Sequence, residues 1–244
     1  MKLYAYPINA FINSLTRIAY ALSGIGVIYF AYLVLPEGST ITGATFSDTL
    51  IAFLLFQTCF YFLGIFFYNS PELVLQIHRG QLDNKLIRPC SSVWNILLQE
   101  IYPTSARDMF YSAILLIGLT WYYNSFTILE WMALLGIFIS SCIIMSSLNL
   151  MFSSCCFYFE GFLKGPNWFK DQASQICRYP KDIYPEVFQW IFFPIFFVAT
   201  PVFSLLRHTY TFNDVLLQLF MTIATLLISL YIWNQGLRHY SSAN

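Results

Sequence analysis

The chain has 244 residues, of which 58% are hydrophobic, 20% aromatic and only 10% charged, and its formal net charge at pH 7 is zero. Soluble globular domains carry about 25% charged residues, so a chain this poor in charge cannot cover a water-facing surface. The composition indicates an integral membrane protein, and the absence of net positive charge argues against a nucleic-acid partner.

Residues 1–17 are mildly amphipathic and predict a helix that lies in the inner membrane interface, with a frayed lead-in as the alternative. Six apolar windows without Asp, Glu, Lys, Arg or His follow, and each is long enough for a span of about 20 residues once flanking residues are added. We therefore expect one all-α membrane domain, residues 1–244, with six transmembrane helices. The windows are 18–35, 49–68, 110–123, 131–159, 187–206 and 215–233.

Basic residues gather in alternate connections between these windows. All but one of the 12 Lys and Arg residues lie in the N-terminal segment, in connections 69–109 and 160–186, or in the C-terminal tail, and Arg207 is the exception. Because cytoplasmic loops carry the excess of Lys and Arg, this asymmetry predicts that both termini and both long connections are cytoplasmic. The connections on the other side are short, so we expect no folded extracellular domain.

A polar segment, residues 76–89 (QIHRGQLDNKLIRP), separates the second and third windows. Just before it, Ser-Pro-Glu at residues 70–72 is typical of a helix start: a capping hydroxyl, a first-turn proline and an acid near the positive helix end. Gly80 can end that helix, and Pro89 can stop the short turn that follows. The pattern predicts an amphipathic helix–break–helix at the cytoplasmic surface. The alternative is a solvated connection whose charges serve orientation only.

Two Tyr-Pro steps in connection 160–186 predict a rigid elbow that aims the fifth span. Proline fixes its own φ and disfavours helix for the residue before it, and tyrosine suits the membrane interface. A plain loop with anchoring aromatic residues is the alternative. The elbow residues are Arg178, Tyr179, Pro180, Tyr184 and Pro185. Within the fifth window, Pro194 and Pro201 predict kinks, and Pro201 is expected to end the span or to open a short re-entrant piece.

Catalytic motifs are absent from the sequence. It contains no phosphate loop of the form G-x-x-x-x-G-K-[ST], and its six cysteines lack metal-finger spacing. No ionisable residue lies inside a window, which argues against a self-powered antiporter. We expect neither an enzyme nor a metal site, and we expect the energy for any transport to come from a partner.

Three stretches resemble one known family. Residues 78–89, HRGQLDNKLIRP, are similar to the "rG-x-LD-x-x-L-x-RP" signature of membrane subunits of bacterial type-2 ATP-binding-cassette (ABC) exporters, in their six-span branch with unassigned substrates. Residues 177–206 resemble its "RYP-x-x-IYP … P … P" segment, and residues 233–244 resemble its "W-x-x-GL-x-x-Y-x-SA" C-terminus. The order is that of the family, although Asn244 stands where the family usually has glycine. The N-terminal third matches only as hydrophobic pattern.

This resemblance implies a permease that forms half of an export pathway in the bacterial plasma membrane. Two copies of a cytosolic ABC ATPase would bind ATP and magnesium, while this chain would hold no cofactor. A second permease copy, or a related permease, would complete the pathway, and the cargo would be amphipathic: a peptide, a lipid-linked compound or a drug. Connection 69–109 would contact the ATPase through Glu72, Arg79, Gly80, Leu82, Asp83, Arg88 and Pro89.

Two other classes of function remain open from the residues alone. One is an accessory membrane scaffold without a pathway. The other is a membrane-embedded enzyme acting on lipid, for which the candidate cluster is Arg178, Lys181, Asp182 and Glu186. The polar residues within the windows either line a pathway or form hydrogen bonds between helices. They are Gln57, Asn149, Gln189 and Gln218.

Overall fold

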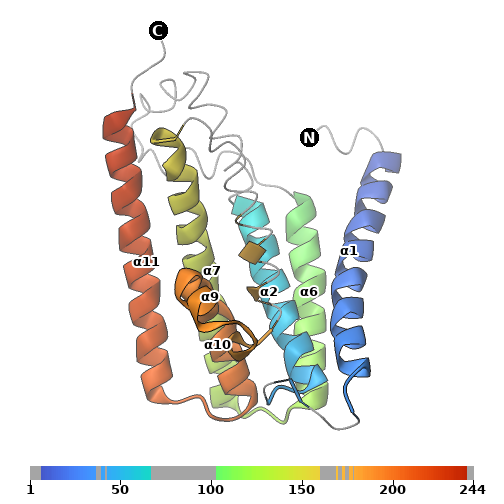
Figure 1. Ribbon diagram of the computed structural model, residues 1–244. Helices are drawn as coiled ribbons and strands as arrows, with labels where there is room; N and C mark the ends of the chain where they lie inside the picture. The colour runs from blue at the N-terminus through green and yellow to red at the C-terminus, as the bar shows by residue number, and fades with distance from the viewer. Residues whose placement is uncertain are drawn as a thin grey trace.

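In the computed structural model, all named elements are helices, and the helices that can be described form one bundle (Figure 1). The structure describes residues 7–36, 40–41, 43–66, 103–159, 169, 172–173, 176–177 and 179–240. The long helices are α1 (Pro7–Leu33), α2 (Phe46–Phe66), α6 (Pro103–Tyr123), α7 (Ile128–Ser154) and α11 (Phe212–His239). The shorter ones are η2 (Cys155–Phe157), η4 (Lys181–Ile183), α9 (Glu186–Ile191) and α10 (Phe193–Leu206).

Three described helices are long and apolar enough to cross a membrane. They are α2, α7 with its η2 extension, and α11, while Leu22–Leu33 and Phe193–Leu206 are shorter apolar helices. An all-helical membrane protein is therefore confirmed, whereas the number of six spans and the side of each terminus stay predictions. α1 runs unbroken from Pro7, so residues 7–17 continue the helix of the first window. α6 begins at Pro103, ahead of the predicted start at residue 110.

Local sequence explains where α2, α7 and α11 begin. Each is preceded by threonine with an acid three residues later, which is the spacing of a capping box. Thr127 N–H donates to Glu130 Oε2 at 2.7 Å at the start of α7. Thr211 N–H donates to Asp214 Oδ2 at 2.7 Å at the start of α11. At α2, the Asp48 carboxylate likewise accepts from the N–H of Thr45 at 2.9 Å.

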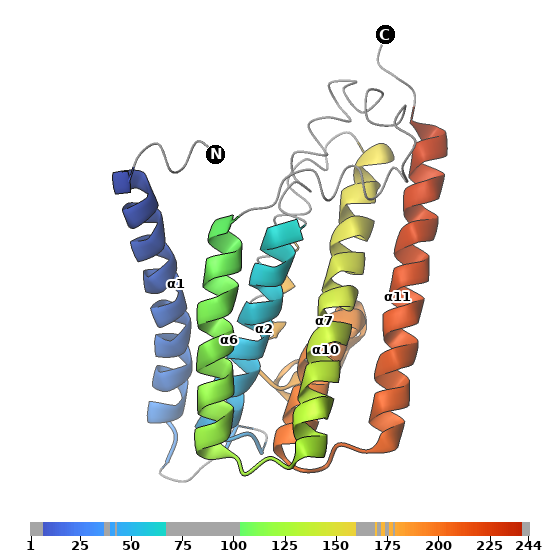
Figure 2. The same cartoon turned by 180° about the vertical axis from the view of Figure 1, so that it is seen from behind.

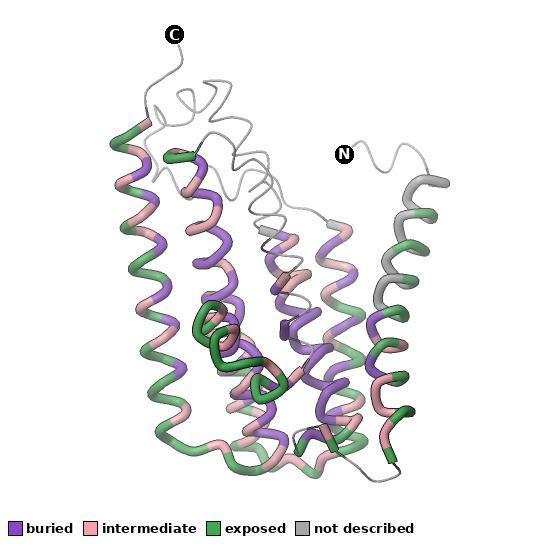
Figure 3. Tube along the Cα trace, viewed as in Figure 1, coloured by how far each residue is buried: buried purple, intermediate pink, exposed green. Residues whose placement is uncertain are grey.

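The second helix, α2, lies at the centre of the bundle. It contacts α1, α6, α7 and α10, and 78% of its apolar window is buried, compared with 22% for α11. The helices α1 and α11 lie at opposite edges in both views (Figure 1, Figure 2). Buried positions accordingly concentrate on α2, on the C-terminal half of α7 and on α10 (Figure 3). Close van der Waals packing between the helices favours the bundle, because lipid tails are as apolar as the side chains buried here.

Part of connection 160–186, which the sequence predicts to be a cytoplasmic loop, is buried in the bundle. Phe169, Ala173, Ile176 and Cys177 are buried among the helices. The ring of Phe169 stacks on that of Phe152 in α7, with centroids 4.3 Å apart. Apolar residues enter the bundle here because they fill space between α7 and α10, which loop composition alone does not reveal.

The fifth predicted span is divided into two helices. α9 ends at Ile191, and the backbone turns at Phe192 (φ −101°, ψ 20°) before α10 begins. Pro194 lies in the first turn of α10, where its missing N–H is not needed. Pro201 lies inside α10, which continues to Leu206, so the helix does not end at Pro201 as expected. The interruption is therefore placed just before the first proline.

Candidate functional site: a cavity beside the elbow

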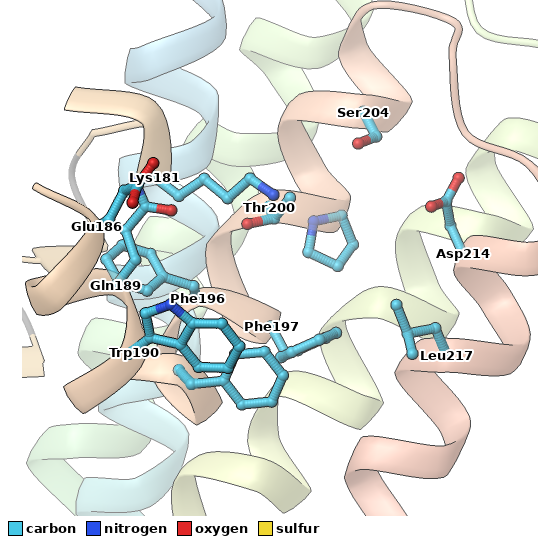
Figure 4. Close-up of a pocket in the computed structure, with 12 residues that line it drawn as sticks. Lys181, Glu186, Gln189, Trp190, Phe196, Phe197, Thr200, Ser204, Asp214 and Leu217 are labelled. Carbon is cyan, nitrogen blue, oxygen red and sulfur yellow. The ribbon is translucent and has the colours of Figure 1, made fainter. Parts of the chain in front are cut away.

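A cavity of about 540 Å³ lies between α9 with the preceding elbow on one side and α11 on the other, and α10 forms its back (Figure 4). We call it the elbow cavity. Its polar lining residues are Lys181, Glu186, Gln189, Thr200, Ser204 and Asp214. Its aromatic lining residues are Trp190, Phe193, Phe196 and Phe197. The mixture gives one half-open space both charged groups and a broad apolar wall.

The two prolines of the elbow hold the chain extended at one wall of the cavity. Pro180 (φ −56°, ψ 146°) precedes η4, and Pro185 (φ −56°, ψ 147°) precedes α9. Both have the fixed φ that the pyrrolidine ring imposes. The hydroxyl of Tyr184, between them, donates to the carbonyl oxygen of Ile176 at 3.1 Å and ties the elbow to the buried part of the connection.

Aromatic packing holds α9 against α10. The Tyr184 ring stacks on Phe188 with centroids 5.2 Å apart and lies 5.5 Å from the ring of Phe196. Phe188 in turn packs on Phe192, at the break between the two helices, with centroids 4.5 Å apart. Gln189 Nε2 donates to the Tyr184 carbonyl at 2.8 Å. These contacts fix the position of Lys181 and Glu186 relative to α10.

The two acids of the cavity stand at helix starts. Asp214 Oδ2 accepts from the N–H and the hydroxyl of Thr211, at 2.7 and 2.8 Å, in the capping box of α11. Glu186 is in the first turn of α9, where a negative charge stabilises the helix dipole. Lys181 is exposed, and its side chain extends across the cavity toward Thr200 (Figure 4).

Part of the predicted site can be compared with this geometry. The described elbow residues Tyr179, Pro180, Tyr184 and Pro185 do not line the cavity, but Pro180 and Pro185 directly precede its lining residues Lys181 and Glu186. Arg178 lies outside the described residues, and so does the whole predicted coupling surface. That surface comprises Glu72, Arg79, Gly80, Leu82, Asp83, Arg88 and Pro89. Their proposed contact with an ATPase stays a prediction.

Lys181 and Glu186, which the sequence placed in a cluster for a lipid-modifying enzyme, both line the elbow cavity, whereas Asp182 does not. Thr200, Ser204 and Asp214 were not predicted for the site. Only Asp214 has a sequence signal, the Thr-x-x-Asp spacing before an apolar run, and this signal predicts a helix start instead of a cavity. No spacing rule would bring Thr200 near Lys181, because the two belong to different elements.

Two of the four polar residues of the apolar windows, Gln218 and Gln189, have contacts that can be compared with the roles considered for them. Gln218 on α11 donates through Nε2 to Ser140 Oγ on α7 at 2.5 Å and accepts from the Tyr210 hydroxyl at 2.9 Å. It therefore forms an interhelical hydrogen bond, as helices in lipid commonly do. Gln189 instead lines the cavity while it bonds the elbow backbone.

The C-terminal stretch surrounds the end of α7. The ring of Phe157 packs edge-on against Trp233, with centroids 5.4 Å apart, and against Tyr240, with centroids 6.1 Å apart. Gly236, on the same side of α11, lies directly against the Phe157 ring. Trp, Gly and Tyr of the "W-x-x-GL-x-x-Y" pattern thus form one clamp on Phe157.

A comparison with protein families finds one matching family. The model of a family described as "ABC-2 family transporter protein" matches residues 22–244. No curated protein and no solved structure matches the chain. The match spans every helix from the second half of α1 to α11, and therefore also every residue of the elbow cavity.

Proposed function

Because this chain belongs to the ABC-2 transporter family, we propose that it is the membrane permease subunit of an ATP-driven exporter and contributes half of the translocation pathway. The single observation that carries the proposal is the family match over residues 22–244. The elbow cavity supports it, since a space with polar and aromatic lining between apolar helices suits a solute that must cross lipid.

A six-span arrangement is consistent with the helices described. α2, α7 and α11 have the length and hydropathy of spans. We assign the other crossings to α1, to α6, and to α9 together with α10. The positive-inside rule then directs both termini to the cytoplasm, in the plasma membrane of a bacterium. A homodimer, or a pair with a related permease, would complete the pathway.

Energy would come from a cytosolic ABC ATPase, in two copies, which binds ATP and magnesium on its own subunit. The sequence of this chain contains no phosphate loop that could do so. Residues 72–89 would form the contact, because a short rigid helix next to a span can pass the movement of a partner to that span.

The proposal is tested by reconstitution with a cytosolic ABC ATPase, which is first sought among the open reading frames next to that of the permease. Charge reversal at Arg79 or Asp83, or Gly80→Leu, should leave membrane insertion intact but uncouple ATP hydrolysis from transport in proteoliposomes. Arg238→Glu, a charge reversal at an exposed position near the end of α11, is the matched control and should behave as wild type. Normal transport in the first three variants would remove the segment from the mechanism.

The other functional classes predict different results in the same assay. ATPase activity that does not change when the chain is added would support an accessory scaffold. Lipid turnover by the purified chain without ATP would support an enzyme.

A further inference from the structure

We propose that the elbow cavity binds the head group of an anionic amphiphile, a carboxylate or phosphate attached to a hydrocarbon chain, through the ammonium group of Lys181. The inference names the cargo class of the permease and so rests on the proposed function. It depends on three features of the cavity: the state of its charges, the hydroxyl of Thr200, and the aromatic wall.

The charged residues of the cavity differ in the contacts that they make. Asp214 is held by two hydrogen bonds from Thr211. Glu186 is exposed in the first turn of α9, where the helix dipole favours a negative charge. Lys181 forms no ion pair among the described residues, and its chain points into the space. A cation that protrudes into a cavity without a structural partner is the group available to a ligand, and an oxyanion is its complement.

Thr200 has a hydroxyl without a partner next to this cation. Helical threonines elsewhere in the chain donate to the carbonyl four residues earlier, as Thr58 does to Leu54 and Thr222 to Gln218, each at 2.7 Å. Thr200 is also helical, yet its Oγ1 is buried and has no hydrogen-bond partner in the described part of the chain. A buried polar atom without a partner is costly. An oxyanion on Lys181 would accept a hydrogen bond from this hydroxyl.

The aromatic lining residues of the cavity suit a hydrocarbon chain. Trp190 is 76% exposed and Phe193 42% exposed at the rim of the cavity, and Phe197 continues the aromatic surface inward. A free inorganic anion would leave these rings uncovered. An amphiphile would cover them with its chain while its head group stays at Lys181, and burial of apolar area would then contribute to affinity.

The test measures binding by the full chain without an ATPase, so that it does not depend on coupling. The purified protein in phosphatidylcholine nanodiscs is labelled with a photoreactive fatty acid, and crosslinks to residues 181–200 are quantified by mass spectrometry. Unlabelled oleate and dodecyl phosphate compete separately, which distinguishes a carboxylate head from a phosphate head. We expect at least one of them to abolish labelling, and inorganic phosphate to have no effect.

Variants assign the binding to the proposed groups. Lys181→Gln should lower the affinity for the competing amphiphile about tenfold, which corresponds to about 1.4 kcal/mol. Lys181→Arg should restore this affinity. Arg238→Gln, the loss of one charge outside the cavity, should not weaken it. Thr200→Val should weaken it less than Lys181→Gln does.

Any one of three results would overturn the inference. The first is unchanged affinity in Lys181→Gln, and the second is competition by inorganic phosphate equal to that of the amphiphile. The third is that dodecyltrimethylammonium competes more strongly than the anionic amphiphiles and that Glu186→Gln abolishes this competition. Any of these could occur while ATP-coupled export remains intact, so the cargo class and the proposed function fail independently.

Discussion

Phe157 fills a notch on α11 that exists because residue 236 is glycine. A β-carbon built at Gly236 would overlap Cδ2 of Phe157 and would lie 3.0 Å from its Cγ and 3.2 Å from its Cβ. Trp233, which is fully buried, packs against the same ring. Phe157 thereby joins the end of α7 to the last turns of α11, at the point where connection 160–186 begins.

Gly236→Ala should destabilise the protein by about 1–3 kcal/mol, because an added methyl group in a filled space forces side chains or backbone to move. The measurement is the midpoint of heat-induced unfolding in detergent. Gly118→Ala is the matched control, since a β-carbon at Gly118 meets nothing within 4 Å. That control should be neutral or slightly stabilising, as alanine is the better helix former. Equal midpoints for the two variants would contradict the clamp.

The packing of α1 on α2 should depend on Gly24. A β-carbon there would lie 2.6 Å from Cζ of Phe53, a residue that is itself buried, whereas one at Gly26 meets nothing within 4 Å. Gly24→Leu should therefore separate the two helices. A cysteine pair placed across α1 and α2 should crosslink less in this variant, while Gly26→Leu should leave crosslinking as in wild type. Reduced crosslinking in both variants would attribute the effect to helix propensity instead of contact.

Glu130 should matter more for stability than its partner His208. Its Oε2 accepts from the N–H and the hydroxyl of Thr127, at 2.7 and 2.9 Å, while Oε1 lies 2.6 Å from Nδ1 of His208. Loss of a helix cap costs about 1 kcal/mol, whereas exposed ion pairs contribute about 0–1 kcal/mol. Glu130→Ala should lower the unfolding midpoint more than His208→Ala. Equal midpoints for the two variants would show that the contact between Glu130 and His208, which both changes remove, outweighs the cap.

Tyr184→Phe should loosen the elbow while it keeps the aromatic packing. The change removes the hydroxyl that donates to Ile176 at 3.1 Å, but it preserves the ring that stacks on Phe188. The cost should be about 1 kcal/mol in unfolding free energy, with faster proteolysis of connection 160–186. Tyr122→Phe, at an exposed position on α6, is the control and should change neither. Equal proteolysis rates for Tyr184→Phe and wild type would contradict a role for this bond.

The sequence by itself determined the class of this protein. A charged fraction of 10% and long apolar windows require a helical membrane protein, because backbone polar groups in lipid must be paired within the segment. The family followed from three motifs in the right order, and the match over residues 22–244 confirms it. The Thr-x-x-acid spacings before α2, α7 and α11 are also local, and they could have placed these helix starts.

Only the tertiary structure decided which helices and side chains are neighbours. Hydropathy cannot distinguish a residue that faces lipid from one that faces another helix, so it does not reveal that α2 is central and α11 peripheral. It likewise does not reveal that Phe169 and Cys177, within connection 160–186, are buried. The elbow cavity brings Lys181, Thr200 and Asp214 together from three elements. Their proximity depends on the break at Phe192 and on long-range packing, which no local pattern encodes.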